Sequence, residues 1–153
     1  MSHDRVRTNR GLVFAALILS GIIWNLNSVS AQDWPQWRGP GRLGVWNEAG
    51  IIERFPDTGL KVAWRTEVGA GFAGPAVADG RVFVLDWQEH SDSRTLDGIE
   101  RVMALDEQTG DVFWTHQWET SYRMLMVTYA IGPRATPTVD GDRVYVVGAT
   151  GRL

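Results

Sequence analysis

The sequence of 153 residues contains no cysteine. This absence excludes a disulfide framework, a thiolate zinc site, a haem attached through Cys-x-x-Cys-His and a lipid anchor on an N-terminal cysteine. An excess of basic residues is absent as well, since 15 Lys and Arg stand against 18 Asp and Glu. The charge balance therefore gives no support to nucleic acid as a partner.

The sequence also lacks an apolar run of the roughly 20 residues that a membrane span needs. Its longest run, residues 11–24, has Ser20 as its only polar residue and follows three Arg in residues 1–10. Residues 29–31, Val-Ser-Ala, supply the small residues of a cleavage site. This pattern predicts a secretory signal peptide over residues 1–31. An uncleaved N-terminal anchor is the alternative, and either one predicts a periplasmic or secreted domain.

Residues 32–59 show no sustained periodicity and are rich in Trp, Gly and Pro. They begin with Asp-Trp-Pro-Gln-Trp-Arg-Gly-Pro at residues 33–40. We predict an irregular N-terminal arm that is held by its Trp side chains. The chain has eight Trp in total, which indicates that this residue type has a structural use here.

From residue 60 onward, short β-branched or aromatic runs alternate with Gly and Asp, which predicts consecutive short strands and an all-β fold. Residues 74–85 and 136–147 repeat each other, and each segment predicts a hairpin, with a turn at Asp79-Gly80 in the first copy. The two copies are 62 residues apart, which is more than the usual 40 to 50 of a propeller repeat. We assign the excess to loops at residues 88–98 and 121–134.

A second repeated element is a turn between two strands, formed by Ala104, Asp106, Thr109, Gly110 and Trp114. Its echo ends at Trp64 and preserves the Asp, the Thr-Gly pair and the Trp almost in register. We expect Asp106 to accept hydrogen bonds from backbone amides of the turn and from the Thr109 hydroxyl. Gly110 is expected to adopt a conformation that a side chain would forbid, and Trp114 to stack on a neighbouring sheet.

The spacing Ala-x-Asp-x-x-Thr-Gly-x-x-x-Trp over residues 104–114 resembles the blade repeat of the pyrroloquinoline-quinone (PQQ)-like β-propeller family, in its exported bacterial members. Residues 34–40 and 134–145 are similar to this family as well, so the resemblance covers about residues 33–153. It implies an all-β propeller of four-stranded antiparallel blades. It also implies that residues 60–153 form a partial propeller domain, because a closed ring takes at least about four blades.

The resemblance implies a strand assignment within that domain. One complete blade is expected from strands at residues 75–78, 81–86, 100–106 and 111–116. A second blade is expected to begin with strands at residues 136–139 and 143–148. Residues 62–67 are expected to be an outermost strand that closes the ring, so that the sequence as a whole would be the N-terminal fragment of a longer protein.

The family's fold serves quinoprotein dehydrogenases, an outer-membrane assembly lipoprotein and exported proteins of other kinds, so fold alone does not choose a function. All recognisable motifs serve blade construction, and we therefore expect a non-enzymatic binding scaffold with a protein partner. The first alternative is a PQQ- and calcium-dependent alcohol or sugar dehydrogenase whose active site lies in other blades. The second is a role like that of the assembly factor, although its lipid anchor needs a cysteine that this chain lacks.

Two groups of side chains are candidate binding residues. Asp86, Glu89, His90 and Asp92 are expected in one loop, where they would be weak candidates for a divalent metal site or would belong to a solvated surface. Arg123 and Arg134 lie in a connection between blades. Such connections line a mouth of the propeller channel, so both Arg are candidates for contact with an anionic ligand or partner. The alternative for Arg134 is that it braces the next blade.

Overall fold

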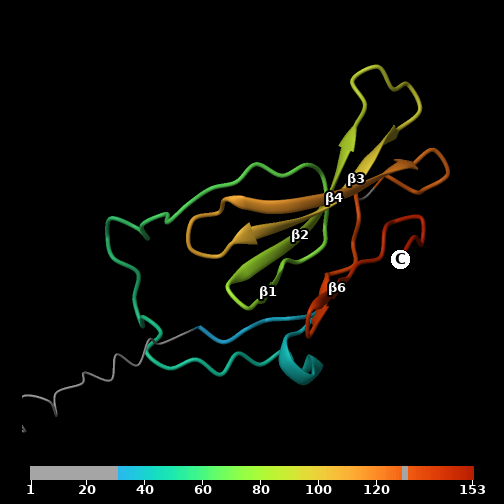
Figure 1. The fold of residues 1–153 in the computed structure, drawn as a ribbon. Helices are drawn as coiled ribbons and strands as arrows, with labels where there is room; N and C mark the ends of the chain where they lie inside the picture. The colour runs from blue at the N-terminus through green and yellow to red at the C-terminus, as the bar shows by residue number, and fades with distance from the viewer. Residues whose placement is uncertain (1–30, 129–130) are drawn as a thin grey trace, which may run out of the picture. The chain divides into compact units, whose positions relative to one another are not determined.

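A computed structural model describes residues 31–128 and 131–153, so the predicted signal peptide lies outside the described residues except for Ala31. The elements follow in the order η1 (Pro40–Arg42, a single 3-10 turn), β1 (Ala76–Ala78), β2 (Arg81–Glu89), β3 (Asp97–Asp106), β4 (Val112–Ser121), β5 (Thr138–Asp140) and β6 (Arg143–Tyr145) (Figure 1). The prediction of an all-β fold is confirmed.

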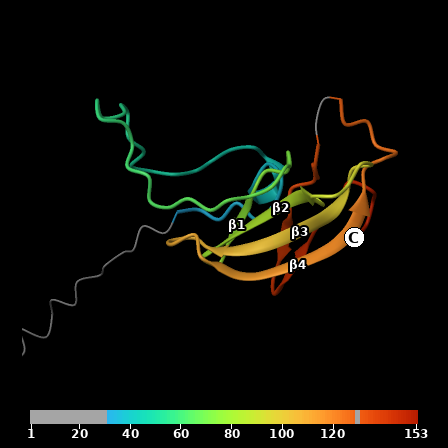
Figure 2. The same ribbon diagram turned by 90° about the horizontal axis from the view of Figure 1, so that it is seen from above.

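Strands β1 to β4 form an antiparallel sheet in the order of the sequence, and β5 and β6 form a second antiparallel sheet (Figure 2). One four-stranded sheet followed by the first hairpin of another is the arrangement of one complete and one partial propeller blade. In the first hairpin, Asp79 and Gly80 have φ of 51° and 70°, as a two-residue type I′ turn requires.

Strands β2, β3 and β4 are longer than the sequence predicted, whereas β1 is one residue shorter. Strand β2 continues to Glu89 and β3 already begins at Asp97, because Gln88 pairs with Ile99 and Glu89 pairs with Gly98. Polar side chains do not interrupt this ladder, since backbone groups make its hydrogen bonds. The loop that we predicted over residues 88–98 is therefore reduced to residues 90–96.

Two buried clusters lie between the two sheets. Ala76, Phe83 and Ala104 form one buried cluster, against which Val139 and Val144 of the second sheet pack. A second cluster of Leu85, Val102 and Trp118 packs against Ala73 and Val146. Every member of both clusters from the first sheet lies on the same face, because side chains alternate along each strand. This face therefore holds the first sheet against the second.

Residues 62–67 have no paired neighbouring strand in the described part of the chain. A strand requires a partner for its hydrogen bonds, and the prediction places the partners of this strand in another blade, so the ring-closing strand stays a prediction. Within the described residues, Trp64 and Thr66 bond to the turn between β3 and β4. Further along, Ala70 pairs with Trp87 and extends the edge of the sheet beyond β1.

The N-terminal arm contacts both sheets. Trp34 pairs with Val77 of β1, and the Pro35 carbonyl accepts a hydrogen bond from the Val139 amide of β5. Two other Trp of the arm do not hold it as predicted, since Trp37 is 61% and Trp46 57% exposed. Backbone hydrogen bonds attach the arm to both sheets.

Candidate functional site

The turn between β3 and β4 is built around the Asp106 carboxylate. Its Oδ1 accepts hydrogen bonds from the Gln108 and Thr109 amides, both at 2.8 Å. These amides, that of Thr109 first, lower the pKa of Asp106 below its ordinary value. The Thr109 hydroxyl, which was expected to donate to Asp106, donates to Asp111 Oδ2 at 2.8 Å, and the Thr109 side chain also contributes to the lowered pKa of Asp106. Gly110 has a φ of 76°.

Trp64, and not Trp114, occupies this turn. Its indole Nε1 donates to the Glu107 carbonyl at 2.8 Å, and the neighbouring Thr66 hydroxyl donates to the Gly110 carbonyl at 2.7 Å. A Cβ atom at Gly110 would lie 2.5 Å from the Trp64 ring. The Thr-Gly turn is thus a docking surface for a Trp that lies more than 40 residues earlier in the chain.

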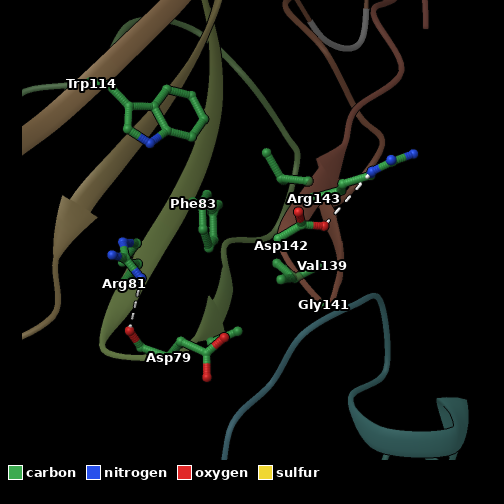
Figure 3. Close-up of a pocket in the computed structure, with 10 residues that line it drawn as sticks. Asp79, Arg81, Phe83, Trp114, Val139, Gly141, Asp142 and Arg143 are labelled. Atoms are coloured by element: carbon green, nitrogen blue, oxygen red, sulfur yellow. Dashed lines mark hydrogen bonds and ion pairs between the residues drawn. The ribbon is translucent and has the colours of Figure 1, made fainter.

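Trp114 lies at a cleft between the two sheets (Figure 3). Its ring centroid is 6.1 Å from that of Phe83, and the side chain is 39% exposed. Val139, Gly141 and Arg143 form the opposite wall of the cleft, whose volume is about 340 Å³. The prediction that Trp114 stacks on a neighbouring sheet is met only in part, because this space separates the indole from the β5–β6 turn.

The Asp86 carboxylate is buried and joins three segments of the chain. Arg101 of β3 donates from Nε to Oδ1 at 2.9 Å and from Nη2 to Oδ2 at 2.5 Å. The Gly69 amide also donates to Oδ2. The ion pair raises the pKa of the Arg101 guanidinium. Both carboxylate oxygens are therefore occupied by donors from this chain.

Glu100 is the second buried carboxylate, with no exposed surface, and sequence reasoning missed it. Its Oε1 accepts from the Tyr122 hydroxyl at 2.6 Å and from the Ala149 amide at 2.8 Å, and its Oε2 accepts from Trp118 Nε1 at 2.9 Å. Burial, and then the bond to Glu100, raises the pKa of the Tyr122 phenol. The burial of Glu100 could have been predicted from the alternation of side chains along β3, which places Glu100 on the same face as Val102.

The proposed metal ligands do not share one loop. Asp86 and Glu89 belong to β2, where Asp86 is bonded to Arg101. His90 does lie in the loop, and its Nε2 is 2.8 Å from Glu119 Oε2 on β4. The described residues contain no group of three or more His, Cys, Asp or Glu that could hold a metal ion. The reason is that β2 extends further than the sequence suggested.

The described part of the connection between the sheets, residues 122–128 and 131–137, borders a cavity of about 270 Å³. The connection contributes Tyr122, Met126 and Arg134 to the lining of this cavity. The segment after β6 contributes Val147 and Ala149. Arg134 is exposed and donates to the Met126 carbonyl at 3.5 Å. Arg123 is exposed, and its charge helps to lower the pKa of Asp97, which hydrogen bonds from Ser121 and Thr95 lower more. Of the two Arg that were predicted as ligand contacts, Arg134 borders the cavity and Arg123 does not.

The two buried carboxylates do not fit the calcium ion and quinone that the family's dehydrogenases hold. Calcium takes six to eight oxygen ligands, and the oxygens of Asp86 and Glu100 already accept hydrogen bonds from this chain. We therefore derive no catalytic step from these residues.

The described residues include no helix long and apolar enough to cross a membrane.

Comparison with known proteins identifies the repeat. The model of a protein family described as "Outer membrane protein assembly factor BamB" matches residues 56–153, which is more than half of the chain. No curated protein and no solved structure gives a significant match. The matched range contains both sheets, the Trp64 docking turn and both buried carboxylates. The chain therefore belongs to this family of PQQ-like β-propeller repeat proteins.

Proposed function

We propose that the chain is part of an exported binding scaffold whose partner is another protein. The observation that carries this proposal is the use made of the buried ionisable groups. Asp86 ties two strands to the segment at Gly69, and Glu100 ties the first sheet to Ala149 beside the second. Groups engaged in this way build a rigid frame and are not free to exchange protons with a substrate.

The connection between the two sheets is the proposed contact surface. It offers the cavity beside Tyr122 and two exposed Arg side chains, Arg123 and Arg134. Arg contributes to protein interfaces through its planar donor groups and its apolar stem. A partner that presents carboxylates next to an apolar side chain matches this combination.

Charge reversal at the connection tests the proposal. The full-length protein is cross-linked in an extract of its own cell envelope, and the linked peptides are identified by mass spectrometry. We expect a defined protein linked to residues 122–135, lost in the double variant Arg123→Glu/Arg134→Glu. Arg143→Glu, a reversal at a side chain 73% exposed on β6, is the matched control and should keep the link.

The dehydrogenase alternative has its own readout. The full-length protein is incubated with PQQ and calcium and assayed with alcohols, sugars and a redox dye. Dye reduction that depends on both additions would overturn the scaffold proposal.

A role in outer-membrane assembly is the second candidate, because it is what the description of the matching family names. It predicts reduced levels of outer-membrane β-barrel proteins when the gene is deleted.

A further inference from the structure

The N-terminal arm occupies the free edges of two strands that belong to different sheets. Trp34 and Val77 of β1 exchange two backbone hydrogen bonds, of 2.8 and 3.0 Å. The next residue, Pro35, accepts a bond of 2.7 Å from the Val139 amide of β5. Strands β1 and β5 are in contact with each other. We call the two free edges together the acceptor edge.

The dipeptide Trp-Pro suits this position for a reason of backbone geometry. Successive residues of an extended chain point their amides and carbonyls to opposite sides. The amide and carbonyl of Trp34 therefore face β1, and the carbonyl of Pro35 faces β5. Pro35 contributes only its carbonyl, which accepts the bond from the Val139 amide, and as a proline it has no N–H to leave unpaired.

The side chain of Trp34 adds a packing requirement. Its ring lies against Gly39, where a Cβ atom would be 2.6 Å from two ring carbons. Gly39 has a φ of 69° and its amide donates to the Gln36 carbonyl. Trp34 also borders an apolar cavity of about 410 Å³, together with Val77 and Trp46. The turn at residues 36–39 of the arm therefore packs against the Trp34 ring.

The rest of the arm contributes little contact area. Trp37 is 61% exposed, Leu43 67% and Trp46 57%. Residues 43–62 contain no regular element, and most of their side chains are exposed. Segments with few buried contacts open at a low free-energy cost. The attachment of the arm therefore rests on three backbone hydrogen bonds, on a bond of 3.4 Å from the Asp79 amide to the Asp33 carboxylate, and on Trp34.

We propose that the acceptor edge is a recognition site for an extended peptide containing Trp-Pro, and that the arm is its intramolecular occupant. A peptide that supplies the same backbone groups and the same ring binds there in place of the arm, by strand addition. This site does not depend on the proposed scaffold function, since it involves neither the connection at residues 122–137 nor a quinone.

The test removes the arm's contacts and supplies them as a separate molecule. Residues 33–39 of the full-length protein are replaced by a Gly-Ser linker of equal length, and the probe is a fluorescent peptide of residues 31–44. We expect saturable binding with one peptide per protein chain. A Trp34→Ala peptide should bind about tenfold more weakly or worse, because an aromatic ring is lost from the contact. A Trp37→Ala peptide is the matched control and should bind like the parent peptide.

A second measurement covers the case in which the linker variant does not fold. In full-length Trp34→Ala, amide hydrogen exchange at Val77 and Val139 should be faster than in full-length Trp37→Ala. An excess of the parent peptide should restore protection at both amides. Three results would each overturn the proposal. The first is equal binding of the parent and Trp34→Ala peptides, and the second is no binding of the parent peptide to a folded linker variant. The third is that excess peptide leaves the exchange of the Val77 and Val139 amides unchanged.

Discussion

At the scale of single residues, the junction between the sheets depends on a carboxylate in an apolar setting. Glu100 shares its face of β3 with Val102 and Ala104, and its oxygens accept bonds from Trp118, Tyr122 and Ala149. A Cβ atom at Gly148 would lie against Glu100 Oε2, so the backbone that follows β6 approaches this carboxylate closely. Glu100 therefore specifies how the sheets meet.

Replacement of Glu100 by Gln should destabilise the protein by about 2 kcal/mol, because one of the three donors would then face an amide N–H instead of an oxygen. Tyr122→Phe removes one hydrogen bond and should cost about 1 kcal/mol. The measurement is the denaturant midpoint of the full-length protein. Glu89→Gln, an exposed site on the neighbouring strand, is the control. A loss in Glu100→Gln no larger than in the control would contradict the structural role of this carboxylate.

His90 provides a prediction about pH. Its pKa is raised from 6.5, first by the hydrogen bond with Glu119. Because the folded-state pKa is the higher one, the stabilising contribution is complete below pH 6.5 and is lost as the pH rises through the folded-state pKa. An NMR titration should give a His90 midpoint above 6.5, and Glu119→Gln should bring it down toward 6.5. Glu53→Gln, in the arm, should leave it unchanged.

At the scale of elements, the turn between β3 and β4 is shaped on both of its sides. Asp106 holds the turn from within through two backbone amides. Trp64 and Thr66 cover it from outside through the carbonyls of Glu107 and Gly110. The Thr-Gly sequence therefore serves a contact between distant segments as well as a local reversal of the chain.

Gly80 and Gly110 allow the cost of backbone strain to be measured separately from the cost of displacing Trp64. Gly110 and Gly80 have φ of 76° and 70°, but only at Gly110 would a Cβ atom meet the Trp64 ring, while at Gly80 the space is open. We expect Gly80→Ala to cost about 1 kcal/mol from the backbone alone. Gly110→Ala should cost more than about 2 kcal/mol, because Trp64 must also move. Equal losses in thermal melting would show that Trp64 does not pack on the turn in solution.

At the scale of the whole molecule, the N-terminus is expected to be created by processing. We propose export and cleavage after Ala31, which makes Gln32 the first residue. In the structure the Gln32 backbone nitrogen lies against the Glu48 carboxylate. After cleavage this nitrogen would be a charged amine, so the same contact would become an ion pair. Mass spectrometry of the protein from the cell envelope should find Gln32 as the terminal residue, and an intact Met1 would favour the uncleaved anchor.

The sequence by itself determined the features that depend on neighbouring residues. The Asp79-Gly80 turn, the period-two strands and the Asp106 turn follow from local backbone chemistry, and the spacing of the Thr-Gly-Trp motif identified the family. The extension of β2 to Glu89 was not predictable in the same way, because ladder hydrogen bonds do not depend on whether side chains are apolar.

Tertiary structure alone decided which distant groups meet. Trp64 rather than Trp114 docks on the Thr-Gly turn, and Glu100 finds a donor 49 residues away at Ala149. Trp34 reaches Val77 only because β1 leaves one edge free beside β5. Such pairings depend on how the sheets pack against each other, and side-chain pattern along a single segment carries no record of that packing.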